Sequence, residues 1–327
     1  MDKSVMNILI TGANGFVGKA LCHELSGRYT HNLVFAATRS THSQITLPLN
    51  VQQVIVASLQ DLIQRRDIIS QVDCIIHLAA RVHQMKDNAA NPLSAFRLIN
   101  TEATYQLARA AAEQGVKRFI YLSSIKVNGE ETTEYHPFTA EDIPAPRDPY
   151  GISKAEAEIQ LKNISSETGL EVVIIRPPLV YGSGVKGNFL SMMQWLDKGF
   201  PLPLGAIYNR RSLVSLPNLV SLITTCIHHP AAANQTFLVS DNADISTTDL
   251  LRQMAHSLGK KPLLIPVPTF CLKFMASLLG KQSLALRLCS SLQVDIQKTQ
   301  ALLHWNPPVS LKEGINLTAN AFIASKH

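Results

Sequence analysis

The stretch "NILITGANGFVG", residues 7–18, decides the fold. Its apolar first half predicts a short buried strand, and the apolar spacing over residues 16–25 predicts a helix directly after it. Between the two, Gly12, Gly15 and Gly18 recur at intervals of three. Backbone N–H groups in such a turn, together with the helix N-terminus, form a binding site for a pyrophosphate. Because a tight turn alone does not require three glycines at this spacing, we predict a dinucleotide-binding loop.

The first half of the chain continues this alternation of strands and helices. Continuous apolar strands separated by helices are typical of a parallel sheet that is covered on both faces. We therefore predict an α/β fold with a doubly wound parallel sheet. The predicted strands are residues 7–11, 33–38, 52–57, 73–80, 118–124 and 171–177, and the predicted helices are residues 16–25, 59–66, 92–115 and 149–168.

The pattern changes after residue 177, where prolines and glycines become frequent. Two capping boxes, Ser246 to Asp249 and Ser310 to Glu313, still predict the starts of helices. We expect residues 1–177 to form the dinucleotide-binding domain. We expect residues 178–327 to form mainly a smaller substrate-binding lobe, with later segments returning to the main sheet.

Length and hydropathy limit the class of protein. The chain has 327 residues, of which 46% are hydrophobic, which is enough for a large core. No stretch reaches about 18 consecutive apolar residues and the start lacks a secretory signal, so we expect a cytoplasmic protein without stable membrane insertion. The apolar stretch "FCLKFMASLLG", residues 270–280, is short and contains a lysine. It predicts a core or interface helix, with contact at a membrane surface as the less favoured alternative.

Cysteine usage and charge exclude several kinds of site. The five cysteines are scattered, odd in number and never spaced as Cys-x-x-Cys, which indicates a reducing compartment and neither a metal site nor a disulfide framework. The net charge of +6 favours acidic partners. The basic residues are distributed along the chain and are not interleaved with aromatic residues, so we do not expect nucleic acid binding. A phosphorylated small molecule would be a sufficient partner.

The end of the second predicted strand indicates which dinucleotide binds. NAD sites place an acidic residue there, about 20 residues after the glycines, to hold the ribose 2′-OH. This chain has no Asp or Glu between Glu24 and Asp61, and Arg39 stands in that position instead. An arginine there can bind a 2′-phosphate, so NADP(H) is favoured. NAD(H) remains the alternative, with Arg39 stacked on the adenine.

The stretch "DPYGISKAEAE", residues 148–158, carries a second chemical signal. Asp148 can cap a helix whose early positions hold Tyr150 and Lys154, and residues four apart face the same side of a helix. A neighbouring positive charge favours the phenolate and lowers the tyrosine pKa from about 10. Such a tyrosine can exchange a proton with an alcohol or sugar oxygen. The spacing alone also fits an unrelated pair on a helix surface.

Five motifs in order resemble the extended short-chain dehydrogenase/reductase family, in its nucleotide-sugar epimerase/dehydratase branch. The resemblance covers nearly the whole chain. It implies a Rossmann domain, a UDP-sugar as substrate, and in many members a homodimer formed through the predicted helices 92–115 and 149–168. The motifs are "TGANGFVG" (11–18), "HLAA" (77–80), "SSIKVNG" (123–129), "YGISK" (150–154) and "RPPLVYG" (176–182).

The resemblance also implies roles for individual residues. Tyr150 would be the acid/base, Lys154 would hold the nicotinamide ribose and lower the tyrosine pKa, and Ser124 would bind the reacting oxygen. Asn188 and Phe189 in "GNFL" and Arg211 in "RRSLVSLPNL" resemble the family's contacts to the nucleotide diphosphate, an anion that the planar arginine fork suits, and Arg287 is a weaker candidate. With Arg39, the cofactor contacts would be Gly12, Gly15, Phe16, Val17, Gly18, Ala79, Ala80, Asn100, Tyr150, Lys154 and Pro177.

Departures from the family pattern bear on the reaction. Dehydratases of this branch carry an Asp-Glu pair directly after the catalytic hydroxyl residue, where this chain has Ile125 and Lys126, so we do not expect a 4,6-dehydratase. Leu179 replaces an asparagine that touches the sugar in many epimerases. Asn128 replaces the usual tyrosine after the serine motif.

These observations leave three candidate functions. The first is a 4-ketoreductase that reduces a UDP-4-keto-6-deoxy-N-acetylhexosamine for surface polysaccharide synthesis. This function is favoured by Arg39 and by the absence of an acidic residue at the end of the second predicted strand. The alternative is a UDP-hexose 4-epimerase acting on the GlcNAc/GalNAc or Glc/Gal pair. A non-catalytic dinucleotide-binding protein is the third, and the intact Ser124, Tyr150 and Lys154 argue against it.

Overall fold

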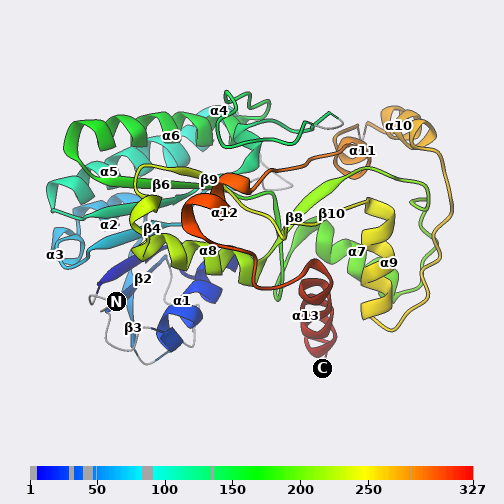
Figure 1. Cartoon of the computed structure of the whole chain (residues 1–327), viewed down its shortest axis with the longest axis horizontal. Coiled ribbons are helices and arrows are strands. Elements are labelled where there is room, and N and C mark those ends of the chain that lie inside the picture. The colour runs from blue at the N-terminus through cyan, green and yellow to red at the C-terminus, as the bar shows by residue number, and fades with distance from the viewer. Residues whose placement is uncertain are drawn as a thin grey trace.

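A parallel sheet and a smaller second sheet organise the chain (Figure 1). The computed structural model describes residues 6–28, 33–39, 47–48, 50–82, 91–133, 136–280 and 282–326. The large sheet has seven strands in the order β3-β2-β1-β4-β5-β6-β9, and every neighbouring pair in it is parallel. Its strands are β3 (Val51–Ile55), β2 (Val34–Thr38), β1 (Ile8–Thr11), β4 (Cys74–His77), β5 (Arg118–Leu122), β6 (Glu171–Arg176) and β9 (Thr236–Leu238).

Two apolar layers hold this sheet between helices. Alternate strand residues point to opposite faces, so Ile8 and Ile10 join one core cluster and Leu9 joins the other. The first face is covered by α1 (Phe16–Arg28) and α8 (Leu216–His228), and the second by α2 (Leu59–Gln64), α3 (Arg66–Ile69), α5 (Ala103–Glu113) and α6 (Pro149–Thr168). The predicted doubly wound α/β fold is therefore confirmed.

The strand order also determines where a ligand can bind. The chain builds β1, β2 and β3 towards one edge and then returns to place β4 on the other side of β1. The crevice at such a reversal, outside the carboxyl ends of the strands, is the ligand site of open α/β sheets. The residues directly after β1 and β4 border that crevice.

One predicted helix has an irregular turn in its middle. Residues 92–115 form α4 (Pro92–Phe96), a π-helical segment η1 (Arg97–Glu102) and α5, which run on from one another. The wide turn carries Asn100 and Thr101, which are both buried against α6. Wide turns of this kind are frequent at functional sites.

A second lobe is built on the three-stranded sheet β10-β8-β7. Its strands are β7 (Leu179–Tyr181), β8 (Arg211–Ser215) and β10 (Asp244–Ile245), and its core is closed by α7 (Gly187–Asp197), α9 (Thr247–Ser257) and α13 (Leu311–Ala324). Both predicted capping boxes are confirmed, since the Ser246 and Ser310 hydroxyls accept the N–H groups of Asp249 and Glu313. The short helices η2 (Ile125–Val127), η3 (Pro230–Ala232) and α12 (Gln297–Leu303) complete the fold with α10 (Thr269–Leu278) and α11 (Gln282–Cys289).

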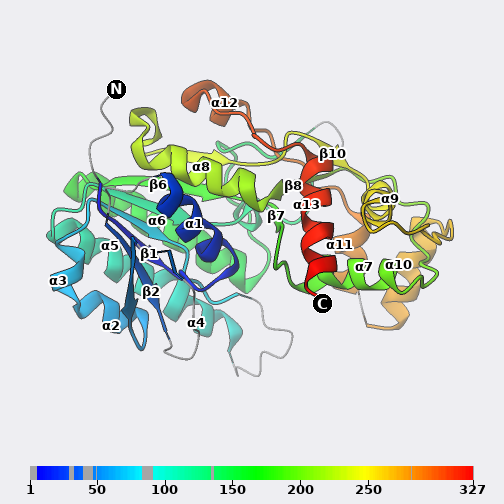
Figure 2. The same cartoon turned by 90° about the horizontal axis from the view of Figure 1, so that it is seen from below.

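Of the two alternatives predicted for residues 270–280, the core helix is wrong, and the interface helix stays a prediction. This segment forms α10, which has no buried residue and lies at the outer end of the second lobe (Figures 1 and 2). Only its Leu272 packs, half-buried, against the core of the lobe. Among the described residues, no helix is both long and apolar enough to cross a bilayer.

Candidate active site

The glycine loop turns sharply between β1 and α1. Gly12 has a φ of +68°, and a Cβ there would lie 2.8 Å from the backbone nitrogen of Ala79. A Cβ on Gly18 would lie 2.3 Å from the carbonyl oxygen of Gly12. Gly15 differs, because it is exposed and a Cβ there would meet only that same carbonyl, at 3.0 Å. Gly12 and Gly18 thus close the turn, while the open backbone at Gly15 and the start of α1 suit a pyrophosphate.

The carboxyl end of β4 is tied to this loop. The Thr11 hydroxyl accepts the N–H of Ala79 at 3.1 Å and lies 2.7 Å from Nδ1 of His77. The other ring nitrogen of His77 lies 3.0 Å from the Thr104 hydroxyl, and burial lowers the pKa of His77 to about 3. A neutral His77 therefore fixes Ala79 beside the glycines. Ala80 follows, half-buried, on the same edge.

Three other predicted cofactor contacts border the same crevice. Arg39 is exposed directly after β2, the strand next to β1, which is where a 2′-phosphate or an adenine would lie. Phe16 and Val17 are the first residues of α1 and are half-buried against the core under the loop. Their side chains support the loop, so their contact with a dinucleotide would be made through the backbone.

The structure brings Ser124, Tyr150 and Lys154 together at the carboxyl ends of β5 and β6. Tyr150 is at the start of α6, whose first turn is capped by the Asp148 carboxylate accepting the N–H of Gly151 at 2.7 Å. The Ser124 hydroxyl lies close enough to the Tyr150 phenol to lower its pKa. The Lys154 ammonium lies 6.0 Å from the Tyr150 ring centroid and donates to the Leu122 carbonyl at 2.9 Å. The arrangement can move a proton at an oxygen held between Ser124 and Tyr150.

The expected lowering of the Tyr150 pKa is wrong for this geometry. Burial, reinforced by the negative charge of Asp148, raises the pKa of Tyr150 to about 12, and the nearby Ser124 hydroxyl offsets only part of this rise. Lys154 adds less positive charge than an exposed lysine would, because burial lowers the pKa of its own ammonium to about 7. The ammonium is also directed at a carbonyl and at the Tyr121 ring, 4.4 Å away.

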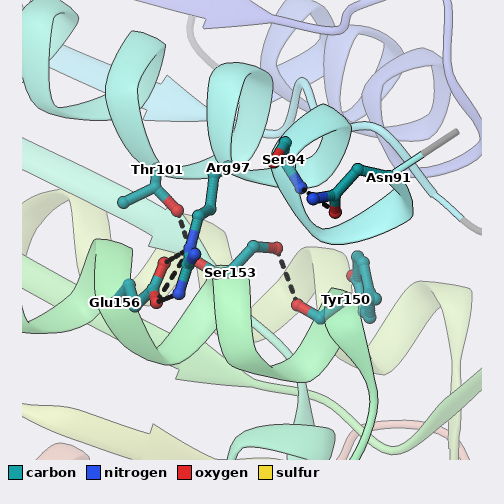
Figure 3. A network of polar contacts seen from close by, with 7 residues as sticks. All are labelled: Asn91, Ser94, Arg97, Thr101, Tyr150, Ser153 and Glu156. Carbon is teal, nitrogen blue, oxygen red and sulfur yellow. Dashed lines mark hydrogen bonds and ion pairs between the residues drawn. The ribbon is translucent and has the colours of Figure 1, made fainter. Parts of the chain in front are cut away.

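Asn100 positions the helix that carries Tyr150 (Figure 3 shows neighbouring contacts). Its amide donates to the Arg81 carbonyl and the Ser153 hydroxyl, both at 3.1 Å, and its oxygen accepts the Arg81 N–H. Ser153 in turn donates to the Tyr150 carbonyl at 2.8 Å, and Thr101 donates to the Ser153 carbonyl. With both amide hydrogens used within the chain, Asn100 holds the segment after β4 against α6.

A buried charged network lies behind Lys154 and was missed from the sequence. Glu158 is one turn further along α6 and accepts from the Arg176 guanidinium at 2.6 Å and from the Ser123 hydroxyl at 2.5 Å. Arg176 also donates to Asn128 at 2.9 Å. Glu158 and Arg176 are almost fully buried. The spacing in the sequence could have indicated this network, because Tyr150, Lys154 and Glu158 recur every four residues and so lie on one face of α6.

The departures from the dehydratase pattern have structural roles. Ile125 is a core residue, and Lys126 pairs with Asp148, the cap of α6. The Ile125 N–H donates to the carbonyl of Pro177, a buried residue directly after β6. Pro177 therefore supports the segment after Ser124. Leu179, by contrast, is exposed at the start of β7.

The predicted substrate contacts lie in the second lobe, and their environments differ. Asn188 is exposed in the first turn of α7. The Phe189 side chain is not available to a substrate, because its ring is 1% exposed and stacks on Tyr181 at 5.2 Å, so a contact by Phe189 stays a prediction for its backbone. Its aromatic side chain closes the core of the lobe instead. Only backbone groups near Phe189, at the start of α7, remain available to an anion.

Arg211 and Arg287 are neighbours. The Arg211 guanidinium donates to the carbonyls of Arg287, at 2.6 Å, and Ser290, at 3.2 Å, and burial lowers its pKa. These bonds orient Arg211 at the start of β8. Arg287 is exposed on α11 and meets Arg211 through its backbone, while its side chain points into solvent.

Fold and site together define the class of protein. Residues 8–240 match the model of the NAD dependent epimerase/dehydratase family, and the chain belongs to that family. Two relatives extend over almost the whole chain. It is 45% identical to the UDP-glucose 4-epimerase of Vibrio cholerae over 99% of this chain and 98% of that one. It is 24% identical to the N-acetyl-alpha-D-glucosaminyl-diphospho-ditrans,octacis-undecaprenol 4-epimerase of Escherichia coli O157:H7, over 95% and 94%.

Solved structures share the fold. The UDP-glucose 4-epimerase of Thermotoga maritima with UDP-glucose has a TM-score of 0.76 and 22% identity, covering 98% of this chain and 100% of that one. The UDP-glucuronic acid 4-epimerase of Bacillus cereus in complex with NAD has a TM-score of 0.77 and 20% identity, covering 98% and 100%. At these sequence identities the solved structures establish only the fold. The class of enzyme is established by the match of residues 8–240 to the family.

Proposed function

We propose that this chain is a UDP-sugar 4-epimerase that works by hydride transfer at C4 of the sugar. The observation that carries the proposal is the 45% identity to an epimerase of that kind along almost the full length of both chains. Ser124, Tyr150 and Lys154 support it, since they meet at the carboxyl ends of β5 and β6, on the same edge of the parallel sheet as the glycine loop after β1. The comparisons therefore support the epimerase better than the ketoreductase that the sequence favoured.

In this proposal the residues of the chain orient the sugar and handle its proton. Tyr150 would take the proton of the C4 hydroxyl and return it to the same oxygen, and Ser124 would hold that oxygen by a hydrogen bond. Lys154 would orient the cofactor ribose. A bound nicotinamide dinucleotide would supply the hydride acceptor and donor. Arg211, oriented by two carbonyls, would bind the diphosphate, with the lobe of residues 178–327 holding the sugar nucleotide.

A 4-ketoreductase is the second candidate function, and one feature favours it. No acidic residue stands between Glu24 and Asp61, and Arg39 is exposed where a 2′-phosphate would lie. A phosphate site suits NADPH, which a reductase consumes. The cofactor preference can be tested by Arg39→Asp. This change should weaken the binding of NADPH much more than that of NADH, because it replaces a cation by a group with the same negative charge as the 2′-phosphate. A tenfold preference of the unmodified protein for NADH would contradict this reading of Arg39.

One experiment separates the two functions. The purified protein would be incubated with UDP-glucose, UDP-GlcNAc and a UDP-4-keto-6-deoxy-N-acetylhexosamine, each with NAD or NADPH, and products would be identified by NMR. An epimerase inverts C4 of a UDP-hexose without net change in nicotinamide absorbance. Stoichiometric NADPH oxidation with the keto sugar alone would contradict the proposal and establish the reductase.

A homodimer is part of the same proposal. Three apolar residues on the relevant helices, Leu98, Tyr105 and Ile159, are exposed by 53%, 39% and 58%. They lie on η1, α5 and α6, the segments through which we expect the chains to pair. Sedimentation of the full chain tests this, and an Ile159→Asp variant should sediment as a monomer.

A further inference from the structure

The outer end of the second lobe exposes large apolar side chains. On α10, Phe270, Phe274 and Leu278 recur every four residues, so they form one stripe along the helix. Their exposed fractions are 71%, 65% and 73%. Lys273 borders the stripe and is exposed too. We call Phe270, Phe274 and Leu278 the α10 stripe.

The α10 stripe is part of a wider apolar surface. Met275 and Leu279 on the same helix are exposed by 57% and 67%, while Leu272, on the inner side, packs against the core of the lobe. Contiguous exposed apolar side chains of this size mark an interaction site. Figures 1 and 2 place α10 at the far end of the molecule from α3, so a large flat partner can reach it without meeting the dinucleotide-binding half.

The charge around α10 indicates the partner. Residues 250–294 contain no Asp or Glu and six of the 30 basic residues, which leaves 24 basic and 24 acidic residues in the rest of the chain. The whole net charge of +6 therefore comes from the segment that contains α10 and α11. Arg252 and Lys260 lie near Asp249 and Asp197. Within the described part of the chain, Lys261, Lys273 and Arg287 are exposed and pair with no carboxylate.

Exposed aromatic and aliphatic side chains next to unpaired lysines are what an anionic lipid surface binds. The apolar face enters the boundary between head groups and acyl chains, and the lysines meet the anionic head groups. A second copy of this chain would fit less well, because two such surfaces would bring two acid-free, basic segments face to face. We propose that the α10 stripe, with Lys273 on the same helix and Arg287 on the adjoining α11, docks this enzyme on the surface of a membrane that contains anionic phospholipid.

The arrangement would hold the protein at the surface without spanning the bilayer. Docking through α10 leaves the dinucleotide-binding half of the chain away from the lipid, since α10 lies at the outer end of the second lobe (Figure 1). The proposal does not depend on the reaction that the site performs. Its test therefore uses binding and not turnover.

Co-sedimentation of the full chain with vesicles tests the proposal. We expect about tenfold more bound protein on vesicles with about one-third phosphatidylglycerol than on pure phosphatidylcholine, and a fall in binding with salt. Phe270→Ser/Phe274→Ser and Lys273→Glu/Arg287→Glu should each reduce binding to the phosphatidylcholine level. Equal binding to both vesicles, or no binding, would overturn the proposal.

Matched variants at the other end of the molecule serve as controls. Ile55→Ser replaces an exposed apolar residue on β3, and Lys162→Glu reverses an exposed charge on α6. These variants should bind vesicles like the unmodified chain, and urea unfolding should show that all variants are folded. Sedimentation velocity on the Phe270→Ser/Phe274→Ser variant tests whether a second copy of the chain covers α10 instead. A change from dimer to monomer, with unchanged vesicle binding, would assign α10 to a contact between two chains. That result would overturn the proposal.

Discussion

Helices α6 and α10 reverse the usual relation between residue type and burial. On α6, Lys154 and Glu158 are each 2% exposed, while on α10 Phe270 and Leu278 are exposed by 71% and 73%. Lysine and glutamate are almost never fully buried unless they are paired, and exposed apolar side chains are informative where they gather in one patch. On α6 the burial of charged groups costs stability, while on α10 the exposed apolar side chains gain no stability from burial. The buried charges of α6 belong to the candidate active site inside the molecule. The exposed apolar side chains of α10 fit the membrane surface that we propose as its partner.

The largest effect should come from the phenol at the start of α6. Tyr150→Phe removes the group that we propose to carry the proton, so turnover should fall by about 10² to 10⁴ while dinucleotide binding is nearly unchanged. Steady-state rates and a dinucleotide titration measure the two quantities. Tyr105→Phe, which removes an exposed hydroxyl from α5, is the matched control and should leave turnover unaltered. Full activity of Tyr150→Phe would remove Tyr150 from the mechanism.

The buried charges of α6 should make the next largest difference. Glu158→Ala leaves the Arg176 guanidinium buried without a carboxylate, which should cost about 3–5 kcal/mol in the free energy of unfolding. Glu156→Ala, two residues earlier on the same helix, breaks the exposed pair with Arg97 and should cost at most about 1 kcal/mol. Urea unfolding of both variants measures the contrast. Equal costs would show that burial does not distinguish these two ion pairs.

Lys154 should make the stability of the fold depend on pH in a defined direction. Burial lowers its pKa from 10.5 to about 7, so between these values the unfolded chain binds more protons than the folded one. The free energy of unfolding should then rise with pH from about 7 towards 10.5, and the penalty of burying the ammonium should be complete below pH 7. Urea unfolding from pH 6.5 to 9.5 should show a steeper rise for the unmodified chain than for Lys154→Met. Parallel curves would contradict a lowered pKa.

The smallest effect is expected on α10. Phe274→Ala removes an exposed ring and should change the free energy of unfolding by no more than about 0.5 kcal/mol. Leu161→Ala removes a fully buried side chain from α6 and should cost about 2–5 kcal/mol. Thermal or urea unfolding of the two variants completes the comparison. A large cost for Phe274→Ala would mean that α10 packs against the lobe more closely than its exposure indicates.

Much of the fold could be predicted from local patterns. The three glycines at spacing three, the apolar strand runs and the helix start at Asp148 each depend on neighbouring residues, and each is confirmed within the described residues. The π-helical turn at Arg97–Glu102 could not be predicted, because it coincides with contacts from Asn100 and Thr101 to Ser153, more than fifty residues away. The sequence on either side of this turn predicts an ordinary helix, so no local pattern indicates the wide turn.

The candidate site shows the same division. Motifs placed Ser124, Tyr150 and Lys154 in one site, since their spacing and order are visible in the chain. The raised pKa of Tyr150, the turning of the Lys154 ammonium towards the Leu122 carbonyl and the Glu158–Arg176 pair were not visible. They depend on how deeply α6 is buried against β5 and β6.

By itself, the sequence determined the doubly wound sheet, the dinucleotide loop and the chemical groups of the site, because helix and strand periodicity and turn geometry are local properties of the chain. Only the tertiary structure decided which of these groups are charged, which residues position them and which apolar side chains remain outside. It removed Phe189 from the surface and left Phe270 on it, although both are phenylalanines near the start of a helix. The physical reason is that burial, and with it pKa and pairing, depends on residues that meet only when distant segments pack together.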